Sequence, residues 1–127
     1  MPETSGTFDV SFSPADGDDA RWGRRDITKT WHGGVEGAGA GVMLAAGDPA
    51  AGSAGYVAIE SVDGAVDGRR GTFALQQMGT MHAGGSRIEY VVVPGSGTGE
   101  LAGVGGVMRL TVEADGTHRY ELSYTLG

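Results

Sequence analysis

Apolar and polar residues alternate along most of the chain, in short runs separated by turns rich in glycine. Alternation with a period of two places successive side chains on opposite faces of an extended strand, so each run predicts a β-strand. The expected strands are Gly6–Phe12, Arg21–Trp31, Val35–Leu44, Ala54–Val62, Gly71–His82, Ser86–Val93, Val107–Glu113 and His118–Leu126. No segment keeps the periodicity of an amphipathic helix. The pattern therefore predicts an all-β protein.

The connections between these runs favour an antiparallel meander. Most are short, and Asp115-Gly116 between two alternating runs is a strong signal for a hairpin. Closing such a meander into an eight-stranded barrel removes the exposed edges of the sheet. A two-sheet β-sandwich is the alternative, because the long connection Pro94–Gly106 suits a strand that crosses between sheets. In either case we expect one domain over residues 1–127, which is long enough to bury a core.

Composition narrows the classes of function. The chain carries 16 acidic and 9 basic residues, a net charge of −7, which disfavours nucleic acid and membrane surfaces as partners. Cysteine is absent, which excludes disulfides and thiolate catalysis. No apolar leader is visible, so a cytoplasmic location is expected. The three histidines lack the spacing of metal ligands, so neither a metal nor another cofactor is expected.

Several segments carry a family resemblance. They are Ile27–Gly33, Val35–Gly37, Tyr56–Glu60, Asp67–Gln76 and the loop Val93–Gly106. In this order they resemble a bacterial family of small allene oxide cyclase-like (dirigent-like) β-barrels of unknown function. The resemblance implies a closed eight-stranded barrel that forms homo-oligomers, and related barrels include isomerases and cyclases that hold a hydrophobic substrate in the lumen. That family often has a histidine after the Leu-Gln pair, where this chain has Gln77.

Strand pairing can be estimated from the turns. A two-residue loop at Gly33-Gly34 would place Trp31 opposite Glu36, with Lys29 on the same face. A three-residue loop at Asp67-Gly68-Arg69 would place Glu60 opposite Gln76. A slip of one residue exchanges the two faces of a strand. The face on which each of these side chains lies therefore depends on the length of the turn.

Two interpretations of the faces remain open. In the first, the lumen holds Glu36, Glu60 and Gln76, with Lys29, Trp31, Tyr56 and Met78 around them. Glu60 would then be a general acid or base, and Gln76 and Tyr56 would orient a carbonyl group. Lys29, Trp31, Glu36 and Met78 would bind the ligand. In the second, the lumen is dry and apolar, and Glu36 pairs with Lys29 on the surface, because charged residues are rarely buried.

The sequence thus predicts a small-molecule site in the barrel, with a hydrophobic molecule as the expected partner. An isomerase or cyclase that acts on a hydrophobic, carbonyl-bearing compound is one interpretation; a non-catalytic ligand-binding barrel and a structural oligomer are the others. Apolar residues such as Val57, Ile59 and Met78 occur on both faces of the central strands. A barrel has one inside, so we expect a homo-oligomer, a dimer first and a trimer second.

Overall fold

A computed structural model describes residues 2–14 and 23–127, and there it is a closed barrel of eight antiparallel strands in sequence order. The strands are β1 (Glu3–Pro14), β2 (Gly23–Gly33), β3 (Val35–Asp48), β4 (Ser53–Val66), β5 (Arg69–His82), β6 (Gly85–Val92), β7 (Val104–Val112) and β8 (His118–Leu126). Two short 3-10 helices, η1 (Pro49–Ala51) and η2 (Gly99–Leu101), are the helices of the described segments. The predicted barrel is confirmed, and the β-sandwich is wrong. The predicted start of the second strand, Arg21, lies outside the described residues.

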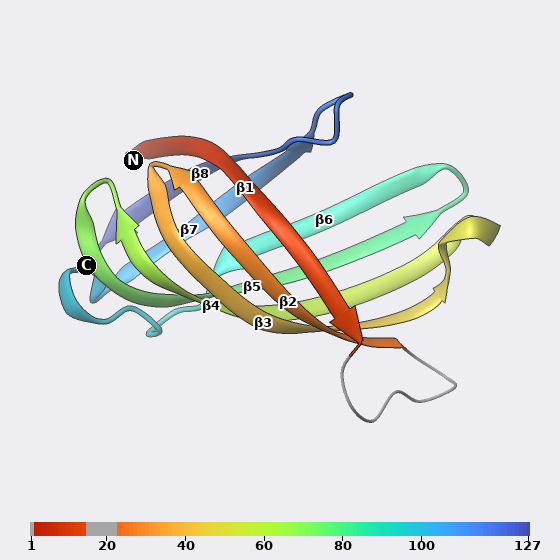
Figure 1. The fold of residues 1–127 in the computed structure, drawn as a ribbon, viewed down its shortest axis with the longest axis horizontal. Coiled ribbons are helices and arrows are strands. Elements are labelled where there is room, and N and C mark those ends of the chain that lie inside the picture. The colour runs from red at the N-terminus through yellow and green to blue at the C-terminus, as the bar shows by residue number, and fades with distance from the viewer. Residues whose placement is uncertain (1, 15–22) are drawn as a thin grey trace.

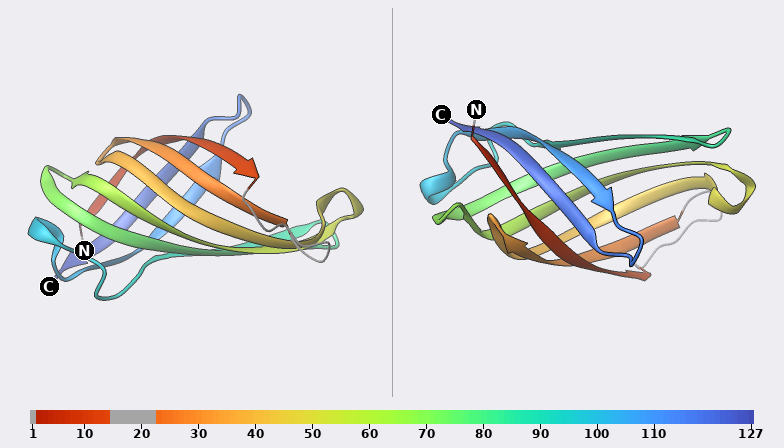
Figure 2. Two further views of the ribbon diagram at one scale, coloured as in Figure 1. Left: turned by 60° about the horizontal axis from the view of Figure 1, so that its bottom comes forward. Right: turned by 90° about the horizontal axis from the view of Figure 1, so that it is seen from above.

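The two ends of the barrel differ, as Figure 1 shows. One end carries the β2–β3 and β4–β5 turns, η2 and the C-terminus, and we call it the plugged end. The opposite end, which we call the open end, carries the β3–β4 hairpin with η1 and the β5–β6 and β7–β8 hairpins. Figure 2 shows the β3–β4 and β5–β6 hairpins projecting beyond the remaining strands at the open end. None of the helices in the described part of the chain is long and apolar enough to cross a membrane.

The apolar core lies toward the plugged end. Its most buried members there are Val35, Val62, Val66, Phe73, Leu101, Val104, Tyr120, Leu122 and Tyr124. The Tyr120 hydroxyl accepts a hydrogen bond from the backbone N–H of Val35 and donates one to the carbonyl of His32, both at 2.8 Å. A buried backbone group needs such a partner. The tyrosine therefore ties β8 to the β2–β3 turn and closes this end.

The long connection after β6 belongs to this closure. The backbone N–H of Thr98 donates to the carbonyl of Thr72 at 2.8 Å, so the loop lies along the start of β5. The Ser96 hydroxyl accepts from the N–H of Ala74 and donates to the carbonyl of Val93. Leu101 in η2 is fully buried. The loop thus covers the barrel end, where a sandwich would have needed a crossing strand.

The predicted register of the β2–β3 hairpin is wrong by one residue. Trp31 pairs with Gly37 in place of Glu36, and Lys29 pairs with Gly39. Trp31 and Val35 are both completely buried, so both must face the core. The observed register achieves this, whereas the predicted one would have turned Val35 outward. Glu36 is consequently exposed on the outer face.

The β4–β5 hairpin also shifts by one residue. Val66 pairs with Arg69 across a two-residue turn, Asp67-Gly68, rather than across the predicted three-residue loop. Both turn residues have positive φ, 49° and 84°, as the mirror-image turn of a tight hairpin requires. Glu60 therefore pairs with Leu75 rather than with Gln76. The next hairpin, β5–β6, likewise has a two-residue turn, Ala83-Gly84, because His82 pairs with Gly85.

The strands β6 and β7 form the weakest junction of the barrel. They pair at Val91 and Val107. Toward the open end the two strands separate, and Figure 1 shows the β7–β8 hairpin turning away from β6. A cleft of about 560 Å³ lined by residues 88–91 and 107–111 lies between them. We call this junction the β6–β7 seam.

Candidate functional site

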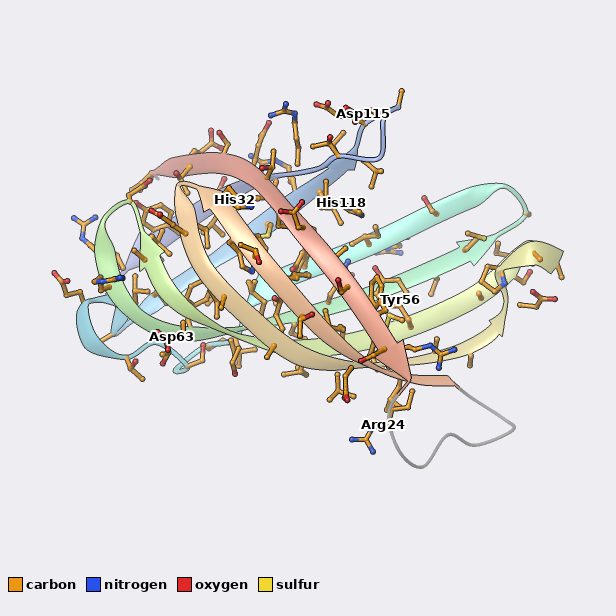
Figure 3. The ribbon with its side chains drawn as sticks, viewed as in Figure 1. Arg24, His32, Tyr56, Asp63, Asp115 and His118 are labelled. Atoms are coloured by element: carbon orange, nitrogen blue, oxygen red, sulfur yellow. The ribbon has the colours of Figure 1, made fainter. Side chains whose placement is uncertain are left out.

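An apolar pocket of about 360 Å³ lies at the open end of the lumen. The β3–β4 and β5–β6 hairpins line it, with Met43, Tyr56, Met81 and Ile88 as the large side chains. Small residues fill the remaining lining positions, which leaves the space open. Figure 3 shows Tyr56 toward the open end, between β1 and the strands β4 and β5 in that view. An apolar pocket with few polar groups is the usual form of a small-molecule site.

Tyr56 lies on the inner side of this pocket and bonds to Gln77. Gln77 Nε2 donates to the Tyr56 hydroxyl at 2.6 Å, which leaves the hydroxyl hydrogen available for donation. Burial raises the pKa of Tyr56, and the hydrogen bond from Gln77 partly offsets this effect. Tyr56 is therefore protonated at neutral pH and can donate to a carbonyl oxygen.

A buried charged cluster lies deeper in the lumen and consists of Lys29, Glu60 and Tyr90. Lys29 is 8% exposed and Glu60 4%. Lys29 Nζ donates to Glu60 Oε1 at 2.6 Å and to the Tyr90 hydroxyl at 2.8 Å, and that hydroxyl donates to Glu60 Oε1 at 2.7 Å. Burial, and next the charge of Glu60, raise the pKa of Tyr90, so its hydroxyl stays protonated. We call these three residues the lumen triad.

Two polar atoms beside the lumen triad have no hydrogen-bond partner in the described protein. They are Trp31 Nε1, a donor, and Glu60 Oε2, an acceptor. Both border Gly39: a Cβ at that position would lie 3.0 Å from Nε1 and 2.8 Å from Oε2. The glycine thus leaves room for the two polar groups. Buried polar atoms are normally satisfied, so an unpaired donor and acceptor side by side indicate a place for a bound polar group.

The pocket and the lumen triad are connected along one face of the sheet. Tyr56, Ala58 and Glu60 occupy alternate positions of β4, and all three face the lumen. Gln77 pairs with Ala58 on one side and with Tyr90 on the other. Polar groups therefore run from the mouth of the pocket to the buried charges, past the small side chain of Ala58.

The structure brings four of the predicted site residues together and separates the other three from them. Lys29, Trp31, Tyr56 and Glu60 face the lumen. Glu36, Gln76 and Met78 are exposed on the outer face, because the two register shifts reverse their direction. Met78 lines an apolar groove there, together with Leu44 and Val57. The predicted surface pair of Glu36 with Lys29 does not form, because Lys29 is paired with Glu60.

Sequence reasoning missed Gln77 and Tyr90 as site residues. Gln77 faces the lumen where Gln76 was expected, and Tyr90 contacts Lys29 and Glu60 from β6. One signal in the sequence did point to the site. Lys29 is the only lysine in the chain, and it stands between Ile27 and Trp31 at alternate positions of an apolar strand face. A lysine that is not used for surface charge is a candidate for a special role. No group of three or more metal-ligating side chains is arranged to hold an ion among residues 2–14 and 23–127.

The fold and the lumen together define a small antiparallel barrel with an apolar mouth and buried charges. Its family is shown by sequence: the chain belongs to the family described as "Protein of unknown function (DUF3224)", whose model matches residues 4–124. The crystal structure of a protein of unknown function from this family, from Shewanella oneidensis MR-1, is similar, with a TM-score of 0.91 and 42% identity. The match covers 100% of this chain and 98% of that one. No curated protein matches the chain. The expected family without an assigned function is confirmed, while the likeness to allene oxide cyclase-like barrels rests on the sequence motifs alone.

Proposed function

We propose that the barrel binds a small, hydrophobic, carbonyl-bearing molecule in its lumen and transfers a proton on it, as an isomerase or cyclase does. The carrying observation has two parts: the apolar pocket at the open end, and the inward-facing row on β4 from Tyr56 to the buried carboxylate of Glu60, whose Oε2 has no partner among the described residues. The apolar lining suits a hydrophobic body, and the polar row suits one oxygen-bearing end. The likeness to allene oxide cyclase-like barrels agrees with this proposal.

Each residue of the site has a role in this proposal. Glu60 is the acid or base, through its Oε2 atom, to which no group of residues 2–14 and 23–127 donates a hydrogen bond. Tyr56, held by Gln77, orients the molecule as it passes inward. Trp31 forms the inner wall, and Met43 and Met81 form the outer wall that was expected of Met78. The proposal needs no metal and no cofactor.

A non-catalytic carrier is the competing function, and one observation favours it. Glu60 Oε1 already accepts hydrogen bonds from Lys29 and Tyr90, which holds the carboxylate in place. Such a preformed group can bind a ligand without exchanging protons. The two functions therefore differ in whether Glu60 moves a proton.

Deuterium exchange separates the two functions. With a linear methyl ketone in heavy water, we expect the protein to catalyse deuteration of the carbon beside the carbonyl. NMR measures the rate of this exchange. Glu60→Gln should lower that rate about 100-fold or more, because general bases contribute roughly this much. Glu36→Gln is the matched control on the outer face and should leave it unchanged.

Other outcomes decide against parts of the proposal. Binding of the ketone without deuteration would leave the carrier function and exclude proton transfer. Absence of binding would exclude the lumen site for this class of compound. Glu60→Asp, which keeps the charge, is a second variant in case Glu60→Gln does not fold, and circular dichroism checks both.

Self-association is a separate expectation that concerns the outer face. Cross-strand neighbours Leu44, Val57 and Met78 form one apolar row there, and Ile59 and Val107 lie on the adjacent row. Val57 and Ile59 are 50% and 52% exposed. Exposed apolar rows of this kind can pack against the same rows of a second copy, as in a symmetric dimer. We expect light scattering to give a mass above the 12.9 kDa of one chain.

The matched variants for this expectation are Ile59→Glu and Val112→Glu. Both replace an exposed apolar side chain, but Val112 ends β7 and is not part of the two rows. Ile59→Glu should give the monomer, and Val112→Glu should not. A monomeric wild-type protein would contradict the expectation.

A further inference from the structure

The only lysine of the chain is buried inside the barrel. Every other cationic side chain, histidine apart, is an arginine, and lysine is among the residues least often found in protein interiors. Arginine cannot act as an amine nucleophile at neutral pH, whereas lysine can. The chain thus places its single side-chain amine in the lumen.

The surroundings of the amine are those of a reactive group. Lys29 Nζ lies 2.6 Å from a carboxylate oxygen of Glu60, which can take its proton directly. The ring of Phe8, with its centroid 4.5 Å from Nζ, and that of Trp31, at 5.2 Å, lie close to the amine. The hydroxyl of Tyr90, at 2.8 Å, bonds to both the amine and the carboxylate and so can pass a proton between them.

Stability alone does not explain the pair. A buried ion pair costs desolvation of both charges, and apolar residues of similar volume often stabilise a protein as well or better. The barrel surrounds the pair with apolar side chains, including Phe8, Ile27 and Met108, and such a core could have continued through these positions. A role in chemistry accounts for the charges where packing does not.

We propose that Lys29 forms an imine with an aldehyde or ketone bound in the lumen. This inference rests on the proposed function and deepens it, since it makes the carbonyl group of the ligand the point of covalent attachment. It gives Glu60 the role of proton shuttle for Lys29. An imine also activates the neighbouring carbon for loss of a proton, which is the step that the proposed function assigns to this site.

The covalent step balances within the lumen triad. Glu60 accepts a proton from the Lys29 ammonium, and the neutral amine attacks the carbonyl carbon to form a C–N bond. The carbonyl oxygen takes that proton and becomes a hydroxyl group. The nitrogen then gives a second proton to Glu60. When the C=N bond forms, Glu60 passes this proton to the hydroxyl group, which leaves as water. One ammonium and one carbonyl become one iminium and one water. The positive charge opposite Glu60 is preserved, so no unpaired buried charge arises.

The two unpaired atoms beside Gly39 fit this sequence. The intermediate carries a hydroxyl group, which donates one hydrogen bond and accepts another. Trp31 Nε1 can donate to it, and Glu60 Oε2 can accept from it. The same two atoms would hold the water that leaves. Oε2 belongs to the carboxylate whose Oε1 lies 2.6 Å from Lys29 Nζ, so this place beside Gly39 is close to the reacting amine.

Reductive trapping tests the inference with cinnamaldehyde as the probe. Incubation with the aldehyde and cyanoborohydride should increase the mass of the protein by the mass of the aldehyde less one oxygen. Tryptic cleavage after Lys29 should disappear. The α-amino group is the remaining amine, and peptide mapping separates the two positions. Lys29→Arg keeps the charge and should abolish the internal adduct. Glu60→Gln should slow its formation about 100-fold.

Calorimetry of the same probe, and of cinnamyl alcohol, which cannot form an imine, distinguishes the possible failures. Binding of both compounds without an adduct on Lys29 would overturn the imine and leave the lumen site intact. Binding of neither would overturn the proposed function and the imine with it. An adduct confined to the α-amino group also overturns the inference. The wild-type result decides even if a variant fails to fold.

Discussion

Replacing Lys29 by methionine while Glu60 remains should lower the free energy of unfolding by about 3–5 kcal/mol. The carboxylate would stay buried, with the Tyr90 hydroxyl as its remaining partner. Leaving one charge of a buried pair uncompensated is costly, because in the low-dielectric interior neither water nor an opposite charge stabilises it. Urea unfolding followed by circular dichroism measures the change.

The double variant Lys29→Met with Glu60→Leu should recover most of that loss, to within about 1 kcal/mol of the wild type. Arg109→Met is the control, since its partners Glu3 and Glu121 are solvent-exposed and such pairs contribute about 0–1 kcal/mol. If Lys29→Met unfolds at the wild-type urea concentration, water reaches the lumen triad and its description as buried is wrong.

Gly79→Ala should lower affinity for a hydrophobic ketone about tenfold, equivalent to about 1.4 kcal/mol. A Cβ on residue 79 would lie 2.3 Å from Cε1 of Tyr56, so the ring must move away from β5. That movement breaks the hydrogen bond with Gln77 and pushes the ring into the pocket. Calorimetry with the ketone measures the affinity, and the packing strain should cost about 1–3 kcal/mol of stability.

Gly55→Ala is the matched control for this variant. It lies one residue from Tyr56 in the same hairpin, but its added Cβ would meet nothing closer than 3.5 Å. We expect affinity and stability close to the wild type. Equal loss of affinity in both variants would show that the hairpins respond to any added methyl group, and that the position of Tyr56 does not control the pocket.

The order of strands could be predicted from the sequence because each strand carries its own alternation. Even the final strand, His118–Leu126, was predicted with the observed bounds. Alternation, however, does not state which of two faces turns inward when both carry apolar residues. Val57 and Ile59 would have filled a core as well as Ala58 and Glu60 do. The direction of each face was therefore determined by the length of a turn.

The residues that face the candidate site are likewise determined by those turn lengths. One more residue in the Asp67-Gly68 turn would place Gln76 in the lumen instead of Gln77. The preference of Asp-Gly for a two-residue turn, together with Val62 and Val66 at alternate positions with Glu60, could have identified the observed register. The contact of Tyr90 with Lys29 could not be predicted, because it joins β6 to β2 across the lumen and no turn connects these strands.

The β6–β7 seam bears on which molecules the barrel can accept. In a closed barrel, backbone hydrogen bonds hold neighbouring strands at fixed spacing and so fix its circumference. Where β6 and β7 have separated, the circumference can grow without breaking such bonds. Tyr90 stands on β6 beside this junction, so outward movement of that strand would carry its hydroxyl away from Lys29 and Glu60. The width of a bound molecule and the hydrogen bonding of the buried charges are thereby coupled.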